Sequence, residues 1–405
     1  MHIAFFSPGW PPETIQNGIV TCVRWMRQGL QQDGHRVSIF AGGPDSLEAE
    51  PDLYSVQRAL AGRLARRIAR SRFPIERDIL EFGHVIAEHM LKVHRRDPID
   101  VIEMEESMGW AADVAAGTSI PVVTKLHGPG FLHIMEEERE TPFAQAKIQR
   151  EGEALARLPV IVAPSQSTLN ETLARYALQP KLARQLVNPI TLGEGTPLWN
   201  LDRCDRSTVL FVGRFDKIKG GDLALLGFQK LLARQPQMRL VVVGTDPGLL
   251  LPGGTRVHIK DYIASLRDDA LERAVTYRGR LAPAEIAELR ASSLVTMVTS
   301  RHENQAYTVL EAMLQGCPVV CADNSGSSES IEHQRTGLLV ETENTAEIAA
   351  QLERIVVDPE LGRSLGQAAR DYILRTHSPA VVVAHAIDIY REAMALSAAG
   401  RKMRG

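Results

Sequence analysis

Two glutamates are spaced in a way that could bind hydroxyl groups on either side of a phosphate. Glu303 and Glu311 are eight positions apart in the segment SRHENQAYTVLE, between a predicted strand and a helix predicted at Glu311–Gln315. Eight residues are just over two helical turns, so both carboxylates face one side if the loop leads straight into the helix. The intervening amides would open a helix N-terminus, which favours phosphate. One acid could hold a sugar and the other a ribose; a helix-start residue and a solvated helix position are the alternative.

Two of the cations in a glycine-flanked loop after another predicted strand are candidate phosphate ligands. The segment VGRFDKIKGG, residues 212–221, places Arg214 and Lys219 directly after the apolar run Val209–Val212. Two positive side chains in such a loop could clamp a diphosphate. The spacing differs from that of the phosphate-binding loop GxxxxGK[ST], so two solvated surface cations are the alternative interpretation.

Two further positions lie in the N-terminal half. Gly18 opens a helical stretch, where a glycine lets the backbone approach a phosphate closely. His127 follows the predicted strand Pro121–Lys125, and ligands bind at the carboxyl ends of parallel strands. A turn glycine and a structural histidine are the alternatives.

Short apolar runs alternate with longer amphipathic segments, which is the pattern of an α/β protein with parallel sheets. Ile3–Phe6, the helical stretch Val20–Asp33 and Arg36–Phe40 form the first β-α-β unit. Further strands are predicted at Val101–Met104, Pro121–Lys125, Val160–Ala163, Val209–Val212, Leu240–Val243, Val275–Tyr277, Leu294–Val298, Val319–Cys321 and Leu338–Val340.

The length of 405 residues favours two domains, because single cores rarely grow beyond about 250–300 residues. The pattern restarts after Asn188–Trp199, a stretch with two glycines and two prolines that we interpret as a linker. We therefore expect two Rossmann-like, doubly wound lobes, residues 1–190 and 200–379, that face each other across a ligand-binding cleft.

The bulk composition narrows the choice of partners and location. A net charge of −3 gives no basic field for nucleic acid. The N-terminus lacks the features of a signal peptide, and no apolar stretch reaches about 18 residues, so a cytoplasmic location is expected.

Two charged regions of the first lobe allow opposite interpretations of the acceptor. Arg58–Arg72 carries six arginines and an apolar stripe, which suits an anionic acceptor or the inner face of a membrane, or else a solvated helix. Glu103, Glu105 and Glu106, with the run Glu136–Glu138, could attract a cationic acceptor; a solvated acidic loop is the simpler interpretation.

Four blocks of the sequence, taken in order, resemble the retaining glycosyltransferases of family 4 type, also called group 1 glycosyltransferases. They are SPGWPPETIQNGI with the following helix and GHRVSIFA, then KLHGP, then FVGRFDKIKGGDLAL, and last the run from RGRLAPAEIAELRASS through TGLLV. Together they extend from Ile3 to about Val340. The resemblance implies the two-lobed GT-B fold, with a last helix, 380–397, that returns to the first lobe.

The resemblance also implies a role for each candidate residue. Glu303 would contact donor-sugar hydroxyls, Glu311 the ribose, and Arg214 and Lys219 the donor diphosphate. Gly18 would approach the phosphate, and His127 would lie near the transferred sugar. The remaining donor-binding positions would be Asn304, Gln305, Ala306, Tyr307 and Thr308, together with Arg278 near the base. Two places depart from the family pattern: Asn17 replaces the first glycine of the usual pair, and Gln305-Ala306 replaces a common Phe-Gly.

The function implied is transfer of a hexose-type sugar from a nucleoside-diphosphate sugar, with retention at the anomeric carbon. The acceptor could be a small molecule, a glycan or a lipid-linked sugar, in cell-envelope polysaccharide, glycolipid or secondary-metabolite synthesis. No cofactor or metal ion is expected, because cations and helix amides would balance the diphosphate charge and no suitably placed acidic DxD pair is present. The alternatives are a nucleotide-sugar epimerase of the same fold and a non-catalytic binding protein.

Overall fold

The computed structural model describes residues 1–13, 15, 17–42, 50–57, 77–134, 139–251, 254–323 and 326–402. It divides into two compact units: unit 1 comprises Met1–Pro189 with Pro379–Gly405, and unit 2 comprises Ile190–Ser378. The segments Arg58–Arg72 and Glu136–Glu138 lie outside the described residues, so their predicted roles stay predictions.

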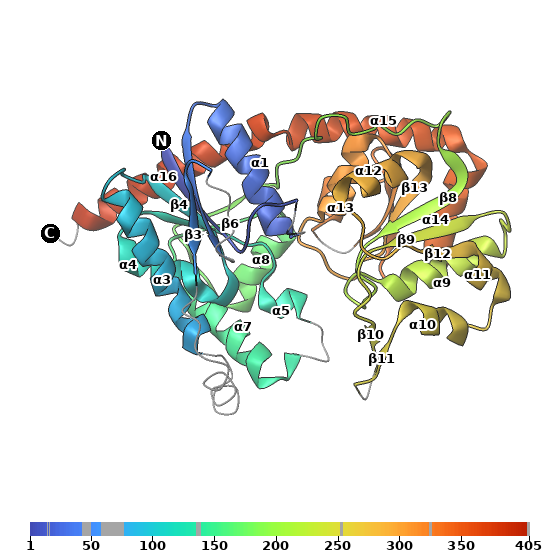
Figure 1. Ribbon diagram of the computed structural model, residues 1–405, viewed down its shortest axis with the longest axis horizontal. Coiled ribbons are helices and arrows are strands. Elements are labelled where there is room, and N and C mark those ends of the chain that lie inside the picture. The colour runs from blue at the N-terminus through green and yellow to red at the C-terminus, as the bar shows by residue number, and fades with distance from the viewer. Residues whose placement is uncertain are drawn as a thin grey trace. The chain divides into compact units, whose positions relative to one another are not determined.

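Unit 1 is built on one parallel sheet with helices packed against it (Figure 1). Among the described residues the strand order is β3-β2-β1-β4-β5-β6-β7. The strands are β1 (His2–Ser7), β2 (Arg36–Gly42), β3 (Leu53–Val56), β4 (Val101–Glu105), β5 (Val122–Lys125), β6 (Val160–Ala163) and β7 (Leu182–Gln185). The helices are α1 (Gly18–Gln32), α3 (Arg77–His94), η1 (Ser107–Gly109), α4 (Trp110–Thr118), α5 (Gly130–His133), α7 (Pro142–Leu155), α8 (Gln166–Arg175) and α16 (Pro379–Lys402).

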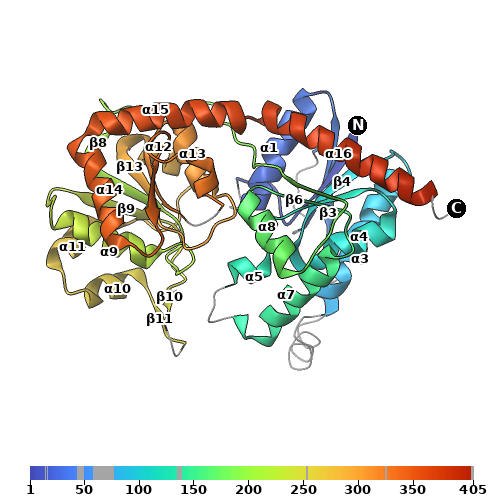
Figure 2. The same cartoon turned by 180° about the vertical axis from the view of Figure 1, so that it is seen from behind.

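The last helix of the chain, α16, belongs to unit 1, and Figure 2 shows it from behind together with α7 and α8. It packs on α1, β4 and β5, and its Val382 and Ala386 side chains are buried. Its Tyr390 hydroxyl donates a hydrogen bond to Glu103 Oε2 at 2.6 Å, in the interior of the unit. Within the described part of the chain, no helix combines the length and apolarity needed to cross a bilayer.

Unit 2 contains a second parallel sheet, in the order β12-β9-β8-β13-β14-β15 among the described residues. Its strands are β8 (Asp205–Val212), β9 (Arg239–Val243), β12 (Val275–Tyr277), β13 (Ser293–Val298), β14 (Val319–Asp323) and β15 (Leu338–Glu341), with the antiparallel pair β10 (Leu249–Leu250) and β11 (Arg256–Val257) outside this sheet. Its helices are α9 (Gly221–Leu232), α10 (Ile259–Ser265), α11 (Asp269–Ala274), α12 (Pro283–Ser292), α13 (Tyr307–Gln315), η2 (Ser328–Ser330), α14 (Thr345–Val357) and α15 (Pro359–Thr376).

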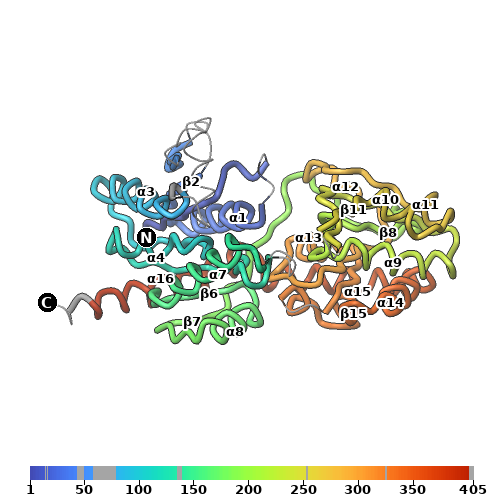
Figure 3. Tube along the Cα trace, turned by 90° about the horizontal axis from the view of Figure 1, so that it is seen from below, coloured from blue at the N-terminus to red at the C-terminus, as the bar shows by residue number. Residues whose placement is uncertain are grey.

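The helices of unit 2 pack on one another in a connected set, in which α14 also contacts α15. α9 packs on α14, while α13 packs on both α12 and α15. Figure 3 shows β15, α14 and α15 on one side of this unit and α10 to α12 on the other. The central strand β13 is buried along its whole length, as expected for a parallel strand covered on both faces.

Candidate functional site

The candidate site of unit 2 begins where two neighbouring strands end. β8 and β13 run parallel and in contact, with Leu210 opposite Thr296 and Phe211 opposite Met297. Both strands therefore deliver their following loops to the same edge of the sheet. The first loop, residues 213–220, carries Arg214 and Lys219, and the second, residues 299–306, carries Glu303.

Lys219 and Glu303 form an ion pair across these two loops. Lys219 Nζ donates to Glu303 Oε1, and Ser300 Oγ donates to the same oxygen at 2.8 Å. The Glu303 side chain is only 8% exposed, whereas that of Lys219 is 30% exposed. The acid is thus held in place by two donors, while the cation remains accessible to an anionic ligand.

Asp216 fixes two residues of the first loop, Arg214 through its side chain and Lys219 through its backbone. Its Oδ1 accepts the Lys219 backbone N–H at 2.8 Å, and its Oδ2 accepts Arg214 Nε at 2.7 Å. The Asp216 side chain is buried, whereas that of Arg214 is half exposed. A carboxylate of this kind fixes a flexible guanidinium before any ligand binds.

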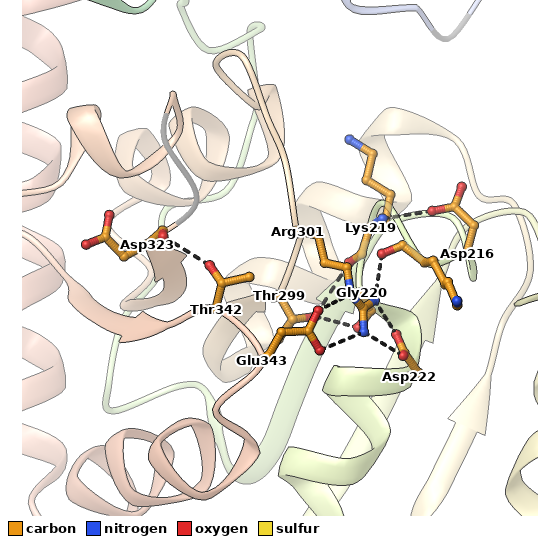
Figure 4. A network of polar contacts seen from close by, with 10 residues as sticks. Asp216, Lys219, Gly220, Asp222, Thr299, Arg301, Asp323, Thr342 and Glu343 are labelled. Carbon is orange, nitrogen blue, oxygen red and sulfur yellow. Dashed lines mark hydrogen bonds and ion pairs between the residues drawn. The ribbon is translucent and has the colours of Figure 1, made fainter. Parts of the chain in front are cut away.

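Arg301 ties the two loops together from the other side (Figure 4). Its Nη1 and Nη2 each donate to one oxygen of Asp222 at 2.8 Å, and its Nε donates to Glu343. Nη1 also donates to Lys217 O at 2.7 Å. Burial disfavours the charge of Arg301, but Asp222 and Glu343 outweigh this effect and raise the Arg301 pKa. Figure 4 shows the Lys219 side chain extending away from this cluster.

Two glycines allow the loops to approach closely. Gly220 has φ +66°, and a Cβ there would lie 1.9 Å from the carbonyl oxygen of Thr299. A Cβ on Gly326 would lie 1.6 Å from the carbonyl oxygen of Asn304. Neither position accommodates a side chain without moving backbone, so the loop geometry depends on both residues.

The predicted donor-binding backbone, Asn304 to Thr308, runs from the second loop into α13. The Ala306 amide donates to Ser327 Oγ at 2.9 Å, so a protein group occupies this amide. Gln305 points its side chain inward: Nε2 donates to Ser330 Oγ at 3.1 Å and lies 3.3 Å from His377 Nε2. The position where the family often has phenylalanine is therefore a buried amide with polar partners.

This network assigns the protonation of His377. Because Gln305 Nε2 can only donate, His377 Nε2 accepts, and the ring proton is on Nδ1, 2.7 Å from Thr376 Oγ1. The Thr376 hydroxyl in turn donates to Tyr372 O. Burial lowers the pKa of His377 to about 4, so the ring is neutral near pH 7.

Acidification is expected to destabilise unit 2 through His377. In the unfolded chain His377 binds a proton below its ordinary pKa of about 6.5, whereas in the folded protein it does so only below about pH 4. The free energy of unfolding therefore decreases as the pH falls through this window, by about 3 kcal/mol in total. Chemical unfolding of the wild type and of His377→Gln, which keeps an acceptor but does not titrate, between pH 7 and pH 4 measures this effect. His258→Gln, at a 56% exposed side chain in the same unit, is the matched control. An unchanged pH slope in His377→Gln contradicts the assignment.

The second glutamate differs from its prediction in local structure. α13 begins at Tyr307, four residues before the predicted start at Glu311, and Val309 and Leu310 in its first turn are already buried. Glu303 lies in the preceding loop, so the helical-spacing argument does not apply to the pair. The Glu311 side chain is 41% exposed and accepts Arg290 Nη2 at 2.8 Å.

Arg278 follows β12, at the edge of the sheet and separated from β8 by β9. Arg278 is exposed, and its backbone N–H donates to Val242 O at 2.9 Å. The structure thus brings Lys219, Glu303 and, through Asp216, Arg214 together, whereas Glu311 and Arg278 have other neighbours.

Gly18 and His127 belong to unit 1. Gly18 is the first residue of α1, and Asn17 caps this helix, with its Oδ1 accepting the Ile19 N–H at 2.8 Å. The residue that departs from the family's glycine pair therefore supplies a helix cap. Burial, with a smaller contribution from Lys125, holds the pKa of His127 well below its usual range, so the ring is neutral.

Glu103, Glu105 and Glu106 are buried, which overturns the interpretation of a solvated loop for these three acids. Glu106 accepts the His127 and Gly128 amides at 2.8 and 2.7 Å, and Glu105 accepts the Ser107 amide at 2.5 Å. Burial, then the charges of Glu105 and Glu151, raises the pKa of Glu106 to about 8. These acids position backbone loops, and Glu106 holds the segment that contains His127.

Sequence reasoning missed Asp216, Arg301, Arg290 and Glu106 as parts of these arrangements. Asp216 and Arg301 lie next to residues that were singled out, so their proximity was a usable signal. Arg290 lies on a different helix from Glu311, 21 positions away, and nothing in the sequence pattern connects the two.

Comparison with known proteins shows which family the chain belongs to, because two family models together match most of it. A family model described as "Glycosyltransferase Family 4" matches residues 16–193, and one described as "Glycosyl transferases group 1" matches residues 201–372. The D-inositol 3-phosphate glycosyltransferase of Streptomyces bingchenggensis is 25% identical over 300 residues. The match covers 71% of this chain but 64% of that relative, so the chain spans less than two thirds of its length.

Solved structures share the fold. Sucrose-phosphate synthase from Thermosynechococcus elongatus aligns with a TM-score of 0.73 and 21% identity, covering 98% of this chain and 99% of that one. Anabaena HepE in complex with UDP aligns with a TM-score of 0.69 and 16% identity, covering 97% and 100%. The predicted architecture, two Rossmann-like lobes of the GT-B type, is confirmed.

Proposed function

Because this chain belongs to the group 1 glycosyltransferases of family 4 type, we propose that it transfers a hexose-type sugar from a nucleoside-diphosphate sugar to an acceptor, with retention at the anomeric carbon. The observation that carries this proposal is the Lys219–Glu303 pair at the adjoining ends of β8 and β13. This pair places a cation that can bind an anion, Lys219, beside a carboxylate that can bind hydroxyl groups, Glu303.

The donor diphosphate binds beside Lys219 and Arg214. When the bond between the sugar and the diphosphate breaks, negative charge grows on the leaving oxygen, and preorganised cations stabilise it without the cost of reorienting water. Lys219 then exchanges its contact with Glu303 for one with phosphate. The released Glu303 carboxylate accepts hydrogen bonds from sugar hydroxyls, so one exchange serves both ends of the donor. These two cations neutralise the diphosphate in place of a metal ion.

Retention follows from attack on the same face that the diphosphate leaves. The acceptor hydroxyl forms the new bond to the anomeric carbon, and its proton passes to the leaving phosphate oxygen. His127 is neutral, so it contributes a hydrogen bond to the transferred sugar rather than a positive charge. The acceptor is a hydroxyl compound of a small-molecule, glycan or lipid-linked kind.

Replacing Lys219 with methionine is expected to weaken nucleoside-diphosphate binding by about 10- to 150-fold. A hydrogen bond to a charged group contributes about 1.5–3 kcal/mol, and methionine keeps the length of the side chain without its charge. Calorimetric titration with UDP, GDP and ADP identifies the nucleotide that the wild type binds and then compares the variant.

The matched control is Lys230→Met, on α9 in the same unit, for which unchanged affinity is expected. Release of nucleoside diphosphate from the corresponding nucleotide sugar tests for the transfer reaction. A Lys219→Met protein that binds the nucleotide as tightly as the wild type contradicts the proposed site.

A further inference from the structure

A fully buried arginine lies behind the second glutamate of the site. Arg290, on α12, is 2% exposed. A guanidinium stays protonated inside proteins, and burying it costs several kcal/mol unless an anion compensates its charge. Its Nη2 donates to Glu311 Oε2 at 2.8 Å, and its Nη1 donates to Gln315 Oε1 at 2.6 Å. Glu311 and Gln315 are one turn apart on α13, so a single cation holds both.

Gln315 fixes the direction in which the guanidinium points. The Gln315 amide nitrogen donates to Pro197 O at 2.8 Å and to Ala287 O at 3.0 Å, which leaves its oxygen to face Arg290. With one arm held by this amide, the other arm of Arg290 has a defined position, at which Glu311 is bound.

The two members of the ion pair differ strongly in exposure. The Arg290 side chain is 2% exposed, and the Glu311 side chain is 41% exposed. Glu311 Oε2 is bound to Arg290, while Oε1 makes no hydrogen bond within the described part of the chain. A glutamate loses up to about 1.5–2 kcal/mol of side-chain entropy when it is immobilised, and a carboxylate that is already tethered has lost much of this freedom before the ligand binds.

Stability alone gives little reason for an arginine at this position. Arg290 Nε is buried without a hydrogen-bond partner. Replacing a buried ion pair by apolar side chains of similar volume is often neutral or stabilising. The charge at this position therefore serves something other than packing.

We propose that Arg290 is a positioning residue that holds Glu311 in the orientation needed to bind the ribose hydroxyls of the donor nucleotide. This inference rests on the proposed function, in which Glu311 contacts the ribose. Arg290 acts only through Glu311, with its guanidinium buried against α13. The protein then distinguishes ribonucleotides from nucleotides that lack the 2′- and 3′-hydroxyls of the ribose, and this discrimination depends on Arg290.

The test compares nucleoside diphosphates with their 2′,3′-dideoxy counterparts. Calorimetric titration first finds which of UDP, GDP and ADP the wild type binds, and then measures the ratio of the two dissociation constants. A ratio of about 10- to 150-fold in favour of the ribose form is expected in the wild type, from the strength of hydrogen bonds to a charged group. In Arg290→Met the ratio is expected to fall below about threefold. Adding Glu311→Ala to this variant should not change the ratio further, because both substitutions remove the same interaction between Glu311 and the ribose.

Arg234→Met is the matched control. It removes the arginine of the exposed ion pair with Glu353 in the same unit and leaves Arg290, Gln315 and Glu311 unchanged, so the ratio should persist. Arg290→Gln repeats the measurement if Arg290→Met does not fold.

The outcomes separate this inference from the proposed function. A wild-type ratio retained in Arg290→Met overturns the inference alone, and so does an equal loss of the ratio in Arg234→Met, which would indicate a general loosening of unit 2. A wild type that binds ribose and dideoxy forms equally overturns the ribose role of Glu311 as well. A wild type that binds no nucleotide overturns both the inference and the proposed function.

Discussion

Replacing Glu303 with glutamine is expected to slow the release of nucleoside diphosphate from a nucleotide sugar by about 10- to 150-fold. Glutamine keeps the shape of the side chain and the acceptor for Ser300 Oγ, but it loses the charge that strengthens hydrogen bonds from sugar hydroxyls. The comparison uses the nucleotide sugar that the wild type turns over fastest, with release followed by a coupled assay.

Binding of the free nucleoside diphosphate should respond in the opposite way to Glu303→Gln. Lys219 loses its partner and the site loses one negative charge, so the affinity should stay constant or increase. Glu353→Gln, in an ion pair with Arg234 elsewhere in unit 2, is the control and should retain the wild-type rate. Full turnover in Glu303→Gln would remove this residue from the reaction.

Replacing Glu311 with alanine is expected to destabilise unit 2 by about 3–5 kcal/mol, a large effect for a half-exposed side chain. The cause is Arg290, which remains buried and charged without an anion. Because about 1 kcal/mol shifts the melting temperature of a unit of this size by roughly 2–4 °C, the change is measurable by calorimetry.

The double variant Arg290→Met, Glu311→Ala tests this cause. Removing both charges together leaves no uncompensated cation, so the double variant should be more stable than Glu311→Ala alone. Glu353→Ala leaves only the half-exposed Arg234 and should cost less than about 1 kcal/mol. A double variant as unstable as Glu311→Ala would mean that the packing of α13, rather than the charge of Arg290, decides the effect.

The sequence predicted the architecture well wherever strands are buried on both faces. Every predicted strand is present, and Val160–Ala163 and Val275–Tyr277 have the predicted bounds. Continuous apolar runs in the sequence indicate such strands. The missed strand β7 reads LARQ and is mostly exposed at the edge of its sheet, and β3 is a short edge strand, so neither carries such a run.

The sequence also placed Lys219 and Glu303 in the loops that follow β8 and β13. What it could not supply was the order of strands in the sheet, which makes those two loops neighbours although 84 positions separate the residues. Strand order depends on which faces pack together over the whole unit, and a local pattern of residues does not contain that information.

By itself, the sequence determined the fold class, the family and the chemical types of residue at the carboxyl ends of the strands, because each is written in local runs and motifs. Only the tertiary structure decided which acid meets which cation: Glu303 pairs with Lys219, Glu311 with Arg290, and Glu106 with the backbone at His127. It also showed that the acids of β4 are buried rather than solvated. The physical reason is that burial and charge pairing are properties of the packed chain, since the energy of a charge is set by neighbours that are distant in sequence.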